Sequence, residues 1–273
     1  MIATGGSLKM QHFLTKLMKR QTLGPIVMNL CELIKIEDTS RFDEIRNKQR
    51  KLSEVTDMIY AAHVFHRTVR NLTPQKELQD QDSVLSLLVG DYLLAQSSVD
   101  MASLRYPKTV GLVAKGLEDY TKGEFLKIHL IERCRQNLND HTGGSRVEGV
   151  NDCHKGINQY AELTCGSLLS NACLSAFYLA GNTERCNGLG DLVYSFGHNT
   201  GSAQRLIEIV NYPNEDDKVV LSFLSNSNLE QSITRYLDKS IEILQRLPDG
   251  RTKPALRGVL EKMRGYLIAG NTM

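Results

Sequence analysis

Apolar residues recur at steps of three and four along most of the chain, which is the period of a helix and not the alternation of a strand. In residues 54–69 one stripe collects Val55, Met58, Ile59, Ala62, Phe65, His66 and Val69. The same pattern returns over residues 83–98, 110–125, 160–180, 189–210, 229–247 and from Pro254 onward. Only 6 prolines interrupt 273 residues, so few helix breaks are forced. We therefore predict an all-α fold, a single-domain antiparallel bundle of about eight helices.

Three segments of the chain need separate expectations. Residues 83–98 are apolar on nearly every side, which favours a central helix. Residues 126–159 are rich in Arg, Asn, His and Gly, and we expect an exposed connection there. Residues 1–25 are basic, with no acid before Glu32, which is typical of either a mitochondrial presequence or a first helix. Residues 26–273 would form the helical domain.

Composition excludes some classes of protein. The chain has 33 Lys and Arg against 31 Asp and Glu, a net charge of +2, which argues against nucleic-acid binding. Its longest apolar run is far shorter than the roughly 20 residues that a membrane span needs, so we expect no transmembrane segment. None of the 6 cysteines forms a CxxC pair, and their spacing favours a reducing compartment over a disulfide scaffold.

Common catalytic and metal-binding motifs are missing from the sequence. The glycines at 188 and 190 lack the preceding strand of a dinucleotide site, and no P-loop or GxSxG spacing occurs. One polar region holds four potential metal ligands whose spacing fits no zinc pattern, so we interpret them as unrelated: Cys134, His141, Cys153 and His154. His63 and His66 share a helix face and could hold a metal or ligand, but two partly buried histidines with polar neighbours are the favoured interpretation.

Five segments together resemble one protein family in order and spacing. They are residues 56–71 (TDMIYAAHVFHRTVRN), 83–95 (SVLSLLVGDYLLA), 122–124 (KGE), 164–173 (TCGSLLSNAC) and 196–201 (FGHNTG). This arrangement is similar to that of the all-trans isoprenyl diphosphate synthases, over about residues 51–210 and more weakly to 263. The Gly-Asp-Tyr-Leu segment is its most specific part. The resemblance implies the all-α isoprenyl synthase fold.

In that family two aspartate motifs hold the Mg²⁺ ions that bind an allylic diphosphate, and hard oxygen ligands suit both. Here the first motif falls on Arg67, Thr68 and Asn71. The second falls on Glu208, Ile209 and Tyr212. The motif's glutamine is Arg205, and the family's Lys-Thr pair is Thr164 and Cys165.

These replacements remove the acids that the chemistry requires. A unit charge pair 4 Å apart is worth about 4 kcal/mol at an effective dielectric near 20, so Arg67 would oppose a divalent ion. We expect no catalytic residue and no metal site in this chain. Arg67 and Arg70 could contact a diphosphate directly, although solvent or a partner's acids are the favoured neighbours of both.

Within the family, the His-Arg-x-Val-x-Asn-Leu pattern is most similar to the non-catalytic second subunit of decaprenyl and longer polyprenyl diphosphate synthases. That resemblance implies a heterodimer or heterotetramer of the mitochondrial matrix, whose catalytic partner holds Mg²⁺. The complex would build the ubiquinone side chain from isopentenyl diphosphate and an allylic primer. This chain departs from that subunit in two ways: its N-terminus is short, and its segment after Val210 is compressed.

The contact with that partner would lie on one helix of this chain. The candidate residues are Leu85, Leu88, Tyr92 and Ala95, although such a stripe is more often internal core. Two alternatives stay open: a weak stand-alone prenyltransferase that uses Glu208, and an isoprenoid-binding module without catalysis.

Overall fold

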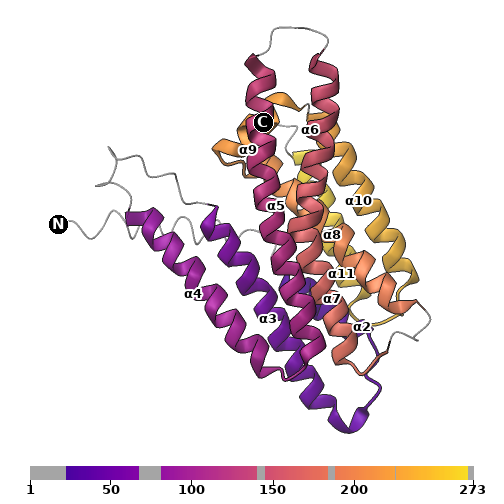
Figure 1. The fold of residues 1–273 in the computed structure, drawn as a ribbon. Coiled ribbons are helices and arrows are strands. Elements are labelled where there is room, and N and C mark those ends of the chain that lie inside the picture. The colour runs from indigo at the N-terminus through magenta and orange to yellow at the C-terminus, as the bar shows by residue number, and fades with distance from the viewer. Residues whose placement is uncertain (1–22, 68–80, 140–144, 184–187, 225, 270–273) are drawn as a thin grey trace, which may run out of the picture.

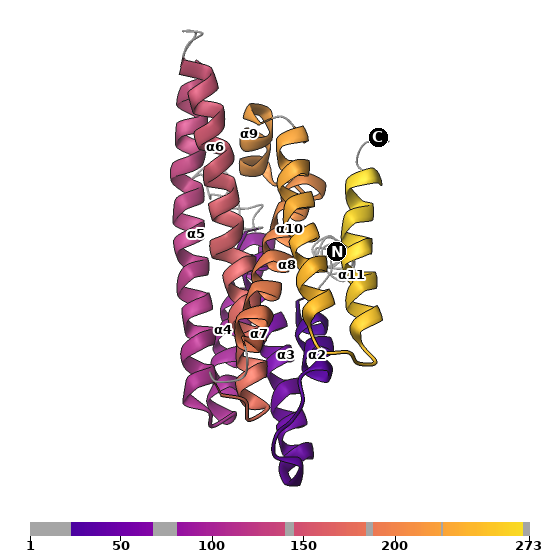
Figure 2. The same cartoon turned by 90° about the vertical axis from the view of Figure 1, so that its right-hand side faces the viewer.

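The computed structural model describes residues 23–67, 81–139, 145–183, 188–224 and 226–269, and every regular element within them is helical (Figures 1 and 2). The predicted all-α fold is confirmed. These residues form ten α-helices that run mostly up and down one long axis. Residues 1–22 lie outside the described part, so the presequence and the domain boundary at 25 stay predictions.

The first two helices pack tightly on each other. α2 (Gly24–Leu33) begins with Pro25 in its first turn, where a missing N–H costs nothing. The backbone N–H of Gly24 donates to Asp57 Oδ1 at 2.6 Å, which ties α2 to α3 (Phe42–His66). A 3₁₀ turn (Thr39–Arg41) leads into α3, so this helix starts well before the predicted residue 54.

α4 (Gln81–Ser103) lies at the edge of the bundle, packed mainly on α3 (Figure 1). The prediction of a central helix at 83–98 is wrong. Small residues face α3: Ser83, Ser86, Gly90 and Ser97 are buried, whereas most large apolar side chains of α4 point outward. A helix that is apolar on all sides can lie in the centre of a bundle or at its edge with one apolar face exposed. The order of apolar residues along the helix is the same in both cases, so it does not predict which one occurs.

α5 (Pro107–Asn139) and α6 (Ser145–Ala161) form a long antiparallel hairpin that extends past the neighbouring helices (Figure 2). The prediction of an exposed connection over 126–159 is therefore wrong. Leu130, Cys134, Cys153 and Ile157 are all buried in it, because steps of three and four persist among the polar residues.

The central helix is α7 (Ser167–Leu179), in which 12 of 13 residues are buried. α6 runs into it through a π-helical turn, η3 (Glu162–Gly166). α8 (Leu189–Asn211) crosses both at very short range. A Cβ at Gly201 would lie 2.2 Å from the backbone oxygen of Cys165, so only glycine fits there.

Three helices complete the bundle on the side of α8. They are α9 (Glu215–Phe223), which starts with a capping box of Asn214 and Asp217, α10 (Asn226–Arg246) and α11 (Lys253–Ala269). Among the described residues, none of the helices combines the length and apolar character needed to cross a membrane.

Candidate functional site

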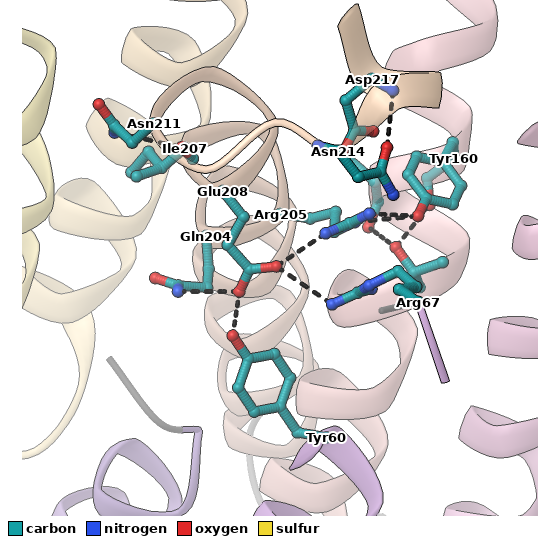
Figure 3. Close-up of polar contacts among 12 residues, drawn as sticks. Tyr60, Arg67, Tyr160, Gln204, Arg205, Ile207, Glu208, Asn211, Asn214 and Asp217 are labelled. Carbon is teal, nitrogen blue, oxygen red and sulfur yellow. Dashed lines mark hydrogen bonds and ion pairs between the residues drawn. The ribbon is translucent and has the colours of Figure 1, made fainter. Parts of the chain in front are cut away.

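The C-terminal end of α3 meets the last turn of α8 in a buried ion pair. Arg67 follows directly after α3, and its Nη2 lies 3.4 Å from Oε2 of Glu208. The two side chains are 11% and 3% exposed. Figure 3 shows Arg67 and Arg205 converging on this one carboxylate from different sides. A position of the first aspartate motif is thus linked directly to a position of the second.

Both oxygens of Glu208 are fully engaged. Arg205, one turn earlier on α8, brings Nη1 to 2.8 Å from Oε2. Oε1 accepts hydrogen bonds from the Tyr60 hydroxyl and from Gln204 Nε2, the latter at 3.1 Å. Neither oxygen is left as a ready ligand for a metal ion.

Two buried tyrosines extend the contacts toward α5. Arg67 Nη1 donates to the Tyr120 hydroxyl at 2.5 Å, and Arg205 Nε donates to the Tyr160 hydroxyl at 3.1 Å. Tyr160 in turn donates to Glu124 Oε1 at 3.1 Å, and Glu124 also lies 3.6 Å from Arg67. The arginines are therefore held by aromatic hydroxyls as well as by carboxylates.

A second buried pair lies beside the first. Lys127 Nζ is 2.6 Å from Asp217 Oδ1, and both side chains are 5% exposed. Asp217 is also the residue that closes the capping box of α9. We use the term polar cluster for the six charged residues Arg67, Glu124, Lys127, Arg205, Glu208 and Asp217. The polar cluster combines three cations with three carboxylates, so it carries no net charge.

Burial and neighbouring charges shift the pKa values in and around the polar cluster. Burial lowers the pKa of Arg67, but Tyr120, Tyr160 and Glu208 outweigh it and the net pKa is raised. Burial also raises the pKa of Asp217, yet Arg205 and Lys127 bring it below its ordinary value. Both residues are therefore ionised at neutral pH.

His63 and His66 lie beside the polar cluster without forming a metal site. Burial lowers the pKa of His63 to about 3, and its ring stacks on Tyr120 with centroids 3.7 Å apart. A Cβ at Gly90 would fall 2.2 Å from Nε2 of His66, so this glycine lets α4 approach α3. The glycine of the Gly-Asp-Tyr-Leu motif thus has a packing role.

Of the remaining positions of the two aspartate motifs, the two that the structure describes do not join the polar cluster. Ile209 is buried in the apolar core and Tyr212 is 39% exposed at the end of α8. Thr68, Arg70 and Asn71 lie outside the described residues. Thr164 and Cys165 are buried in the π-turn.

Several residues that hold the polar cluster together are not among the site residues predicted from the sequence. They are Tyr60, Tyr120, Glu124, Lys127, Tyr160, Gln204 and Asp217. Glu124 could have been predicted, because it belongs to the Lys-Gly-Glu segment on which the resemblance rests. Lys127 could not be predicted as a site residue, because residues 126–159 are expected from the sequence to form an exposed connection.

Within the described ranges, no three His, Cys, Asp or Glu side chains gather closely enough to hold a metal ion. The polar cluster does not fit Mg²⁺ either, since arginine nitrogens, the Gln204 amide and the Tyr60 hydroxyl occupy the oxygens of Glu208. His154, considered with the cysteines as a ligand, instead contacts α10 through Ser232 Oγ at 3.0 Å. His141 lies outside the described residues.

The outward face of α4 and the adjoining part of α5 form a second feature. Leu85, Leu88 and Tyr92 are 44%, 59% and 66% exposed, and Ala95 is exposed beside them. We call the exposed apolar side chains of these helices the α4–α5 face: Val84, Leu85, Leu87, Leu88, Tyr92, Ala95, Val99, Val110, Phe125 and Ile128. Exposed apolar side chains that gather along a helix in this way, as they do on α4, mark interaction surfaces.

Comparison with known proteins gives these features a context. No protein-family model matches the chain. It is 30% identical over 142 residues to the Homo sapiens all-trans-polyprenyl-diphosphate synthase PDSS2, covering 48% of this chain and 32% of that protein. It is 23% identical over 234 residues to the Schizosaccharomyces pombe decaprenyl-diphosphate synthase subunit 2, covering 85% and 67%. The chain spans about a third of the length of the first curated relatives that it matches.

The fold has clear counterparts among solved structures. A decaprenyl diphosphate synthase from Rhodobacter capsulatus superposes with a TM-score of 0.62 at 15% identity, over 90% of this chain and 85% of that one. The chain is therefore similar in sequence to all-trans polyprenyl diphosphate synthases, and it shares the fold of a solved decaprenyl diphosphate synthase.

Proposed function

We propose that the chain is a non-catalytic subunit of a heteromeric trans-polyprenyl diphosphate synthase. The observation that carries this proposal is the polar cluster, in which Arg67 and Arg205 neutralise Glu208 at the site where the family binds its metal ions. The complex would make the ubiquinone side chain from isopentenyl diphosphate and an allylic diphosphate. Mg²⁺ would be held by the catalytic partner.

The electrostatics of the polar cluster support the loss of catalysis. A divalent ion placed 4 Å from Arg67 would be opposed by about 8 kcal/mol at an effective dielectric near 20, because each unit of charge contributes about 4 kcal/mol. Glu208 cannot compensate, since it would first have to leave two arginines and a tyrosine. To capture a diphosphate, Arg67 would likewise have to leave Glu208. Arg70 lies outside the described residues, and its role stays a prediction.

The α4–α5 face supports the heteromeric part of the proposal. Leu88 and Tyr92 are more than half exposed, and covering such side chains stabilises a complex by about 25 cal/mol per Å² of apolar surface. A relative in this comparison is named as subunit 2 of a decaprenyl synthase. Several relatives are named as mitochondrial, and we propose the mitochondrial matrix for this chain.

The decisive experiment compares three samples under identical conditions: the purified chain, the catalytic long-chain prenyl synthase of the same organism, and the two co-expressed. We expect no incorporation of labelled isopentenyl diphosphate by the chain alone. The co-expressed proteins should copurify and be more active than the synthase by itself. Robust turnover by the isolated chain would refute the non-catalytic assignment, and failure to copurify would refute the subunit role.

A further inference from the structure

Two cysteines face each other across the α5–α6 hairpin. The Sγ atoms of Cys134 and Cys153 lie 2.9 Å apart, closer than two sulfurs in ordinary van der Waals contact. The side chains come from neighbouring helices and are separated by 19 positions in the sequence. This pair has no part in the polar cluster or in the α4–α5 face.

The pair lies just beneath the protein surface. Both cysteines are nearly fully buried, at 1% and 3% exposed, yet they line a small surface cavity. Arg133 and Asp152, each more than half exposed, form an ion pair of 3.1 Å beside them. The cavity therefore leaves a short route by which a small polar oxidant can approach the sulfurs.

The two thiols are not equivalent. The hydrogen bond from Cys153 lowers the pKa of the Cys134 thiol, and Arg133 lowers it further against the effect of burial. The same hydrogen bond raises the pKa of Cys153. By contrast, burial raises the pKa of both Cys31 and Cys165 to about 12, which keeps those thiols protonated and unreactive.

We propose that Cys134 and Cys153 form a reversible intramolecular disulfide on exposure to hydrogen peroxide. The Cys134 thiolate attacks one peroxide oxygen and the O–O bond breaks, leaving a sulfenic acid and hydroxide, which takes up a proton as water. Cys153 then attacks the Cys134 sulfur, loses its own proton and expels the hydroxyl group as a second water. Two thiols lose two electrons and two hydrogens, and one peroxide becomes two waters.

The disulfide would join the last part of α5, which ends at Asn139, to the first half of α6, which begins at Ser145. It would close a ring that contains the connection between the two helices. Such a ring restricts the unfolded chain more than the folded one, so the oxidised protein should be the more stable form.

The test uses the full chain, reduced, freed of reductant and treated with increasing hydrogen peroxide. Remaining thiols are alkylated, and peptides are mapped by mass spectrometry without reduction. We expect a linked Cys134–Cys153 peptide that has lost two hydrogens and that dithiothreitol separates again. The thermal midpoint should rise on oxidation and return on reduction.

Variants separate the roles of the two thiols. In C153S, Cys134 should stop at the sulfenic acid and be labelled by dimedone, and the thermal midpoint should not rise. The matched control C31S, which removes a buried thiol elsewhere, should form the linkage as the wild type does. The proposal is overturned if wild-type Cys134 and Cys153 stay reduced while other cysteines react, or if Cys134 proceeds to sulfinic acid without linkage.

Discussion

Replacing Glu208 by glutamine tests the energetic meaning of the polar cluster. Glutamine keeps the shape of the side chain and one acceptor oxygen, so E208Q removes the charge and replaces the other acceptor oxygen by an NH2 group. Contacts of 2.8 Å to Arg205 and 3.4 Å to Arg67 correspond to about 6 and about 5 kcal/mol at an effective dielectric near 20. Desolvation of the three groups offsets much of this attraction. Removing one member of such a buried pair typically costs about 3–5 kcal/mol, because charges are left without a partner.

The assay is urea unfolding at neutral pH followed by circular dichroism, with a thermal melt beside it. We expect E208Q to lower the free energy of unfolding by about 3–5 kcal/mol and Tm by roughly 6–20 °C. E261Q breaks the exposed pair between Arg257 and Glu261, 3.0 Å apart with both side chains over 60% exposed, and should cost no more than about 0.5 kcal/mol.

Two results would contradict this reasoning. If E208Q is no more destabilising than E261Q, the buried charges do not depend on one another. The double variant R67M/E208Q should recover part of the stability, because it also removes a buried cation that E208Q leaves with Glu124, 3.6 Å away, as its remaining ionic partner. A double variant that is less stable than the sum of the single changes would show that the arginine is held mainly by other groups.

Three further predictions concern the partner surface, a buried histidine and a close helix crossing. L88E should weaken copurification with the catalytic synthase at least tenfold, about 1.4 kcal/mol, whereas F42E, an equal change on an apolar side chain outside the α4–α5 face, should leave it unchanged. Because the pKa of His63 is lowered to about 3, the unfolded chain takes up a proton below about pH 6.5 that the folded chain does not. Stability should therefore fall by about 2 kcal/mol from pH 7 to pH 5, and H63F, measured by urea midpoints, should lose this component; an identical decline in both proteins would disprove it. G201A should destabilise by about 1–3 kcal/mol because its Cβ meets backbone at 2.2 Å, while G258A, with open space around it, should gain about 0.5–1 kcal/mol in the same unfolding assay; equal effects of the two changes would contradict the close crossing.

Helical periodicity predicted the elements that are regular in composition and failed where polar residues dilute the pattern. Residues 189–210 were predicted as a helix and form α8, which ends at Asn211. In α5 and α6 the buried positions include Cys134 and Cys153. Cysteine contributes little to the apolar stripe by which a helix is predicted. A helix can therefore be long and still look like a polar connection.

The polar cluster could be predicted only in part, because its contacts join residues that are distant in the sequence. The replacement of acids at 67 and the retention of Glu208 were both visible. Their pairing across 141 positions was not, nor was that of Lys127 with Asp217. Solvent or a partner's acids were the predicted neighbours of Arg67 and Arg70, whereas the fold supplies Glu124 and Glu208 of the same chain to Arg67.

The ion pair between α3 and α8 also bears on the entropy of assembly. In an enzyme that holds these helices together through bound ions, their relative position depends on ligand supply. Here the ion pair of Arg67 and Glu208 holds α3 against α8 without a bound ion. Because α4 packs on α3, the position of α4 is set by the same ion pair. A protein that docks on α4 therefore meets one preorganised surface, and less conformational freedom is lost when the two chains associate.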